Sequence, residues 1–78
     1  MRLEEAEASL RQALVLNADY AEAYSNLGIT LHKLGRLEEA EASLRQTISL
    51  KPEYAEAYNN LGNTLKELGR LEDRKSVV

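Results

Sequence analysis

Apolar and polar residues alternate with the period of an α-helix in four successive stretches of the chain. Within each stretch, leucines, alanines and tyrosines recur three or four positions apart, so they lie on one face of a helix and leave charged residues on the other. Short polar or glycine-containing segments separate the stretches. The pattern predicts four helices, at about residues 3–16, 20–34, 37–50 and 54–68.

The segments between these stretches contain residues that begin or end helices. Asp19 suits the N-cap of the second helix, and Glu22 three residues later completes something close to a capping box. Gly35 stands where a left-handed residue ends the second helix, and the short link Gly35-Arg36 makes the second and third helices antiparallel neighbours. Pro52 cannot extend the third helix but suits the start of the fourth.

The whole pattern recurs every 34 residues. Residues 3–36 and 37–70 are identical at 24 of 34 aligned positions. A period of this length belongs to arrays of helix pairs, in which each unit buries its apolar face by stacking on its neighbours. The predicted fold is therefore all-α.

The repeat also sets the expected domain boundaries. We expect an array over residues 1–72, with one complete repeat at 21–54 between two partial repeats. Gly69-Arg70 should repeat the turn at Gly35-Arg36 and start another helix, but the pattern fails from Asp73. Residues 73–78 are predicted to be a disordered non-repeat tail, and the chain to be a fragment of a longer array.

Small residues on the apolar faces predict how the helices pack. Gly28 and Gly62 lie mid-helix, where glycine costs roughly 1 kcal/mol relative to alanine. Close approach of the following helix would offset that cost, with Ala40 as the facing small residue. Thr47 places a hydroxyl near the core that needs a hydrogen-bond partner.

Composition excludes several classes of protein. The 78 residues have a net charge of −3 with interspersed signs, so they form no basic stripe for nucleic acid. There is no cysteine, and the longest apolar run, Ala13–Leu16, is far too short to cross a membrane. The acidic, amphipathic start does not resemble a secretion signal, so we expect a cytoplasmic protein.

Catalytic and metal sites are not predicted. His32 is the single histidine, and it falls on a helical face that we expect to be solvated, without a carboxylate beside it. Neighbouring glutamates such as Glu38 and Glu39 point about 100° apart on a helix and cannot converge on one substrate. One histidine with scattered carboxylates makes no zinc site. We therefore expect no enzymatic activity and no cofactor.

Particular residues of the repeat resemble the tetratricopeptide repeat family. The matching positions are the aromatic residues Tyr24 and Tyr58, the pairs Leu27-Gly28 and Leu61-Gly62, the small residue Ala40 and the closing Pro52. The likeness covers about Leu3 to Glu72, with departures at Ala18, Leu31, Thr47 and Leu65. It implies a right-handed α-solenoid of antiparallel helix pairs that acts as a scaffold for protein–protein interaction.

In that family the first helix of each pair lines a concave groove that contacts partners. The corresponding polar positions here are Glu22, Ser25, Asn26, Ile29, His32, Lys33, Glu56, Asn59, Asn60, Asn63, Lys66 and Glu67. All four differences between the two copies of this helix fall on this side. They indicate either a groove diversified for an extended peptide or the ordinary drift of exposed positions.

Asn26 and Asn60 are identical and one repeat apart. Stacking would align their amides as a ladder that binds a peptide backbone through hydrogen bonds, although each could instead bond to a neighbouring helix. The ladder resembles the repeat region of O-linked N-acetylglucosamine transferases. The family's clamp for C-terminal carboxylates is disfavoured, because Glu22 and Glu56 stand where basic residues are needed.

Self-association is the alternative function. The first predicted helix lacks a partner on one side, and the last helix lacks one on the other side. In the repeat pattern, the missing partner of each is a helix of the other's type. Helix 54–68 of one molecule could then pack on helix 3–16 of the next, giving a closed pair or an open stack. In that case the chain would be a structural segment without a ligand of its own.

Overall fold

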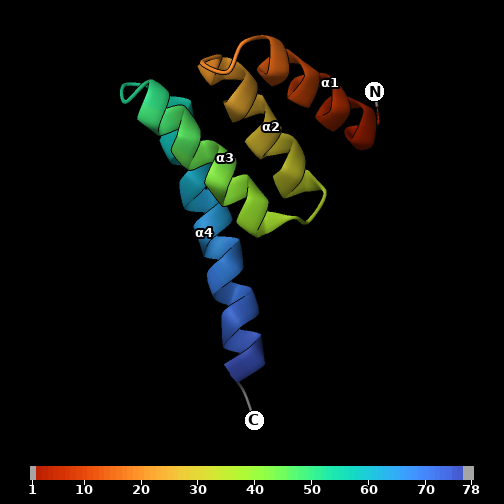
Figure 1. The fold of residues 1–78 in the computed structure, drawn as a ribbon. Helices are drawn as coiled ribbons and strands as arrows, with labels where there is room; N and C mark the ends of the chain where they lie inside the picture. Colours follow the sequence, from red (N-terminus) through yellow and green to blue (C-terminus); the bar gives the residue numbers. More distant parts are fainter. Residues whose placement is uncertain (1, 77–78) are drawn as a thin grey trace.

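The computed structural model describes residues 2–76, and the side chains of residues 2–72. This part of the chain forms four helices: α1 (Leu3–Leu16), α2 (Ala21–Lys33), α3 (Leu37–Leu50) and α4 (Ala55–Ser76) (Figure 1). Each helix packs on the next one in sequence, and α2 also contacts α4. This order of packing confirms the predicted all-α helical-repeat solenoid.

The start of α2 differs from the prediction. Its N-cap residue is Tyr20, without a side-chain capping bond, so the predicted cap at Asp19 is wrong. The Asp19 backbone N–H instead donates to Oδ1 of Asn17 at 3.2 Å. The Asn17 side chain therefore closes a turn just before α2, in place of the predicted capping box of Asp19 and Glu22.

The turn between α2 and α3 forms as predicted around Gly35. Its φ angle is +82°, in the left-handed region that glycine adopts readily. The Gly35 N–H donates to the His32 carbonyl at 3.0 Å, and the Arg36 N–H donates to the Leu31 carbonyl at 2.9 Å. These two bonds form a Schellman motif, which satisfies carbonyls that the end of α2 leaves free.

The second predicted turn, at Gly69-Arg70, is absent, and α4 runs through it to Ser76. Figure 1 shows the C-terminal half of α4 projecting beyond the other helices. A turn would gain little here, because the sequence after Glu72 offers no apolar stripe to pack back on the array, whereas helix propagation adds a hydrogen bond per residue. Residues 73–76 of the predicted disordered tail are thus helical, and 77–78 lie outside the described residues.

The core lies between α2, α3 and α4. Its buried apolar side chains are Ala23, Leu27, Leu31, Ala40, Leu44, Ala57 and Leu61. Leu10 and Leu14 of α1 pack against this core while partly exposed. Thr47 is fully buried, and its hydroxyl donates to the Ser43 carbonyl at 3.1 Å, so it has the partner that its position requires.

Helices α2 and α3 approach each other closely at Gly28. A Cβ at this position would lie 2.6 Å from Leu44 Cγ and 3.4 Å from the Ala40 carbonyl oxygen. The close approach expected for this glycine is confirmed. Leu44 supplies the tightest contact, and Ala40 brings its backbone alongside.

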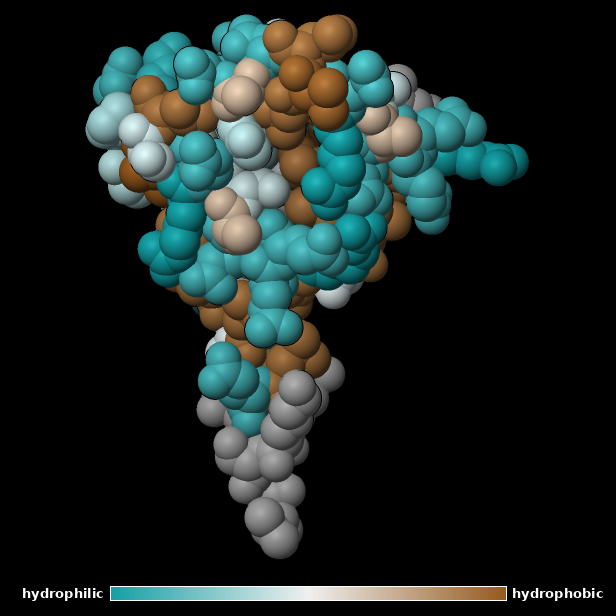
Figure 2. Space-filling view, viewed as in Figure 1, coloured by the Kyte–Doolittle hydropathy of each residue, from teal (hydrophilic) through white to brown (hydrophobic). Residues whose placement is uncertain are grey.

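The equivalent face of α4 is open. Tyr58 is 50% exposed and Leu65 is 40% exposed, and Gly62 has nothing within 4 Å of where its Cβ would lie. These residues were predicted to be buried, but among the described residues no helix follows α4 to cover them. Leu71, further along α4, is also 40% exposed. Figure 2 shows hydrophobic residues on the projecting part of α4.

An ion-pair cluster joins α1 to the start of α3. Arg36 donates two bonds to the Glu39 carboxylate, at 2.7 and 2.8 Å, and one to Glu7 at 2.6 Å. Arg11 bonds Glu7 at 2.9 Å and lies 3.6 Å from Glu39. The bonds from Arg36 hold the pKa of Glu7 and of Glu39 below the ordinary value, with Arg11 contributing to both.

Candidate functional site

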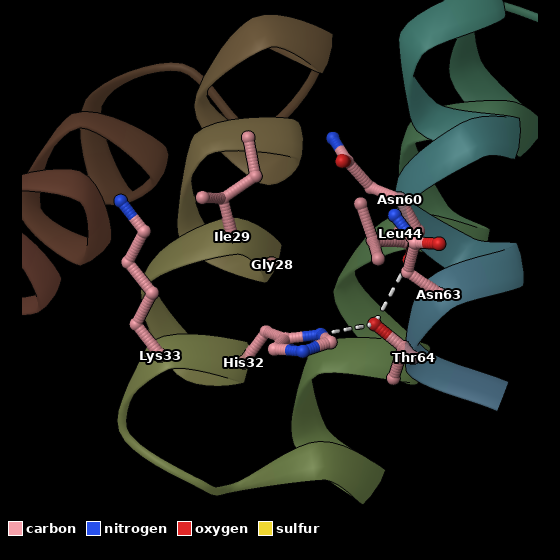
Figure 3. Close-up of a pocket in the computed structure, with 8 residues that line it drawn as sticks. All are labelled: Gly28, Ile29, His32, Lys33, Leu44, Asn60, Asn63 and Thr64. Carbon is pink, nitrogen blue, oxygen red and sulfur yellow. Dashed lines mark hydrogen bonds between the residues drawn. The ribbon is translucent and has the colours of Figure 1, made fainter. Parts of the chain in front are cut away.

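A pocket of about 150 Å³ lies between α2 and α4, with α3 behind it (Figure 3). We call it the α2–α4 groove. It is lined by Gly28, Ile29, His32 and Lys33 from α2, Leu44 from α3, and Asn60, Asn63 and Thr64 from α4. Five of these residues, Ile29, His32, Lys33, Asn60 and Asn63, belong to the predicted groove, whereas Gly28, Leu44 and Thr64 do not.

The walls of the α2–α4 groove differ in chemistry. In Figure 3, Ile29 on α2 stands across from Asn60 and Asn63 on α4, whereas the Lys33 side chain extends along the side of α2 away from α4. The groove therefore combines an apolar side chain, two amides and a positive charge. Among the described residues Lys33 forms no ion pair, so its charge is available to an incoming group.

His32 closes one end of the groove by a hydrogen bond to α4. Its Nδ1 lies 2.8 Å from the Thr64 hydroxyl, which donates its own proton to the Asn60 carbonyl at 2.9 Å. With the hydroxyl proton on the Asn60 carbonyl, Nδ1 of His32 is the donor to Thr64.

His32 is half-buried, so the prediction of a solvated histidine is wrong. Its partner, Thr64, lies 32 residues away on a different helix. Periodicity within one helix carries no signal for such a contact. The 34-residue repeat does bring α2 and α4 together, but it does not show which side chains meet between them.

Asn60 is half-buried at the edge of the groove, and its Nδ2 is buried without a hydrogen-bond partner in the described chain. Its counterpart Asn26 is exposed and lines a second hollow, formed by α1 and α2, with Ala6, Ser9, Leu10, Ile29 and Thr30. The carbonyls of Asn26 and Asn60 each accept a bond of 2.9 Å from the threonine four residues later. The two asparagines thus hold equivalent places in successive repeats.

The other predicted groove residues do not line the α2–α4 groove, and they differ in exposure. Glu22, Glu56, Asn59 and Lys66 are exposed outside the α2–α4 groove, and Glu67 is half-exposed and pairs with Arg70 at 3.0 Å. Ser25 is fully buried, and its hydroxyl has no hydrogen-bond partner among the described residues. Helical periodicity places Ser25 on the open face, but the neighbouring helices cover it.

Metal clusters and membrane-spanning helices are absent from the part of the chain that the structure describes. No cluster of three or more histidines or carboxylates that could hold a metal ion occurs there. In the same residues, no helix is both long and apolar enough to cross a membrane. The α2–α4 groove brings together five of the predicted groove residues, more than the hollow between α1 and α2, which holds Asn26 and Ile29.

Comparison with protein families identifies the repeat. A family model described as TPR repeat matches residues 2–35 and 30–69, which together span most of the chain. The chain belongs to the TPR repeat family. TPR repeats commonly mediate protein–protein interaction and generally serve as non-catalytic scaffolds, and the two TPR matches overlap the four helices described above.

The family match is to the TPR repeat itself. No curated individual protein matches the chain. The likeness to the TPR region of O-linked N-acetylglucosamine transferases therefore stays a prediction, and so do the residues of the groove that contact a partner.

Proposed function

We propose that this TPR chain is an interaction scaffold that binds an extended peptide segment of a partner protein along the faces of α2 and α4. The observation that carries the proposal is the pair Asn26 and Asn60, which occupy equivalent positions beside two successive hollows. A peptide in extended conformation presents backbone N–H and carbonyl groups at regular intervals. Side-chain amides both donate and accept, so they suit such a ligand whatever its sequence.

The chemistry of the α2–α4 groove supports the same ligand. The Nδ2 donor of Asn60 is buried and lacks a partner in the described chain. Rotation of this side chain into the groove would bring the donor within reach of a peptide carbonyl or a bridging water. Ile29 offers apolar contact. Lys33 favours a peptide with an acidic residue at that end of the groove, because opposite charges attract across a partly desolvated surface.

The test is a titration of fluorescently labelled extended peptides, with and without an acidic residue, followed by anisotropy. The double variant Asn26→Ala, Asn60→Ala should weaken binding about tenfold, the effect of losing two hydrogen bonds of about 0.5–1 kcal/mol each. The matched control is Gln12→Ala, Gln46→Ala, which removes two exposed amides one repeat apart on α1 and α3, which we call the outer helices. Equal affinity for both double variants would discard the asparagine ladder.

A further inference from the structure

The contact between α2 and α3 is the most extensive one between any two described helices. In the 34-residue repeat, α4 is the copy of α2 and α1 is the copy of α3. Among the described residues, α4 has no following helix and α1 has no preceding one. Each therefore lacks the partner that α2 and α3 provide for each other.

The open face of α4 retains the residues that dock α2 on α3. Leu27, Gly28 and Leu31 of α2 recur as Leu61, Gly62 and Leu65 of α4. Leu31 is 1% exposed, whereas its counterpart Leu65 is 40% exposed. Gly28 fits tightly against Leu44, whereas nothing lies within 4 Å of a Cβ built on Gly62. Helix α4 thus has a shaped contact surface that no described residue covers.

The open face of α1 carries the complementary surface. Residues 3–12 are identical in sequence to residues 37–46 of α3. Ala40 and Leu44 are fully buried in the contact with α2, but their counterparts Ala6 and Leu10 are partly exposed and line the hollow beside α1. The missing burial on α1 thus falls at the positions that match the missing burial on α4.

We propose that the chain associates head to tail, with α4 of one copy docked on α1 of the next in the geometry of the α2–α3 contact. Gly62 would receive Leu10 of the second copy as Gly28 receives Leu44. The two surfaces are different, so a docked pair still has one free α4 face and one free α1 face. Such a heterologous contact builds an open stack that grows with concentration.

Charge and size set the strength of this contact. Arg11 lies 3.6 Å from Glu39, and the repeat places Arg45 of one copy beside Glu5 of the next in the same way. Arg45 is exposed and free to reach out from its pair with Glu41. Asn59 opposes docking, because it is larger than Ser25, which is fully buried at the equivalent position. The association is therefore weak, and associated chains outnumber monomers only at high protein concentration.

The test uses one variant for each surface. Gly62→Gln places a side chain where Leu10 of the second copy must fit, at a site that is open in the single chain. Ser9→Lys does the same on α1: Ser9 is exposed, whereas its counterpart Ser43 lines a hollow together with Tyr24 and Leu27 of α2. The control is Gln12→Ala, on the outer side of α1. Circular dichroism confirms that each variant keeps its helices.

Mass is measured by sedimentation equilibrium from about 10 µM to about 1 mM. The unmodified chain and the Gln12→Ala control should rise in mass together, while each blocked variant stays monomeric. An equal mixture of the two blocked variants should stop at a heterodimer, because each supplies the one intact surface that the other needs. A monomeric unmodified chain at the highest concentration, association of either blocked variant alone, or a monomeric mixture would overturn the proposal.

Discussion

The backbone of Gly28 lies so close to the side chain of Leu44 that a Cβ on the glycine would be 2.6 Å from Leu44 Cγ. No such neighbour surrounds Gly62, which holds the same position one repeat later. One sequence motif thus occurs in a packed and in an open environment within a single chain. The difference separates the effect of packing from the effect of helix propensity.

Alanine at these two glycines should change stability in opposite directions. Gly28→Ala is expected to lower the free energy of unfolding by about 1–3 kcal/mol, because the added methyl forces Leu44 or the helices to shift. Gly62→Ala should raise it by about 0.5–1 kcal/mol, because alanine favours the helix and meets no neighbour. Urea unfolding of dilute protein measures both. Stabilisation by both substitutions would show that α2 and α3 are less closely packed.

The hydrogen bond between His32 and Thr64 should contribute to the docking of α2 on α4. Thr64→Val removes the acceptor of this bond and is expected to cost about 1 kcal/mol. Thr30→Val is the matched control, since the Thr30 hydroxyl makes the same bond to its own helix and bonds no histidine among the described residues. The difference in urea midpoint isolates the bond. Equal losses would mean that His32 adds nothing.

The sequence predicts the features that are set by local pattern, and it fails for the features that are set by neighbouring helices. The helices, the turn at Gly35 and the close approach at Gly28 depend on local pattern and on the repeat, and all three were predicted. The turn at Gly69-Arg70 was predicted from the same dipeptide and is absent, because a turn also depends on the helix that follows it. The burial of Ser25 and the bond of His32 depend on neighbouring helices, which periodicity within one helix does not describe.

The two identical Gly-Arg dipeptides give a direct test of that explanation. Gly35 has a φ of +82°, so Gly35→Ala should destabilise the fold by about 1–2 kcal/mol. Gly69 lies inside α4, so Gly69→Ala should instead stabilise it by about 0.5–1 kcal/mol. Thermal unfolding by circular dichroism distinguishes the two signs. A loss of stability at both positions would indicate that α4 ends near Gly69 in solution.

Stability should fall in acid through the ion-pair cluster at Arg36. The pKa values of Glu7 and Glu39 are lowered in the folded chain, so their contribution is present above the ordinary glutamate pKa of 4.5 and is lost as the pH falls through the lowered values. Urea midpoints measured from about pH 7 to about pH 3 follow this loss. Glu7→Gln should flatten the dependence, while Glu38→Gln, outside the cluster, should leave it unchanged. An unaltered profile in Glu7→Gln would remove Glu7 from the account.

The proposed function rests on where a peptide binds. The most direct measurement is a ¹H–¹⁵N NMR titration of this chain with the tightest-binding labelled peptide from the anisotropy assay. Binding along α2 and α4 predicts that the largest shift changes occur at Ile29, Asn60 and Asn63, with the side-chain amide of Asn26 also affected. Changes confined to the outer helices, such as at Gln12 and Gln46, or no change at all, would contradict the assignment of the α2–α4 groove as the binding site.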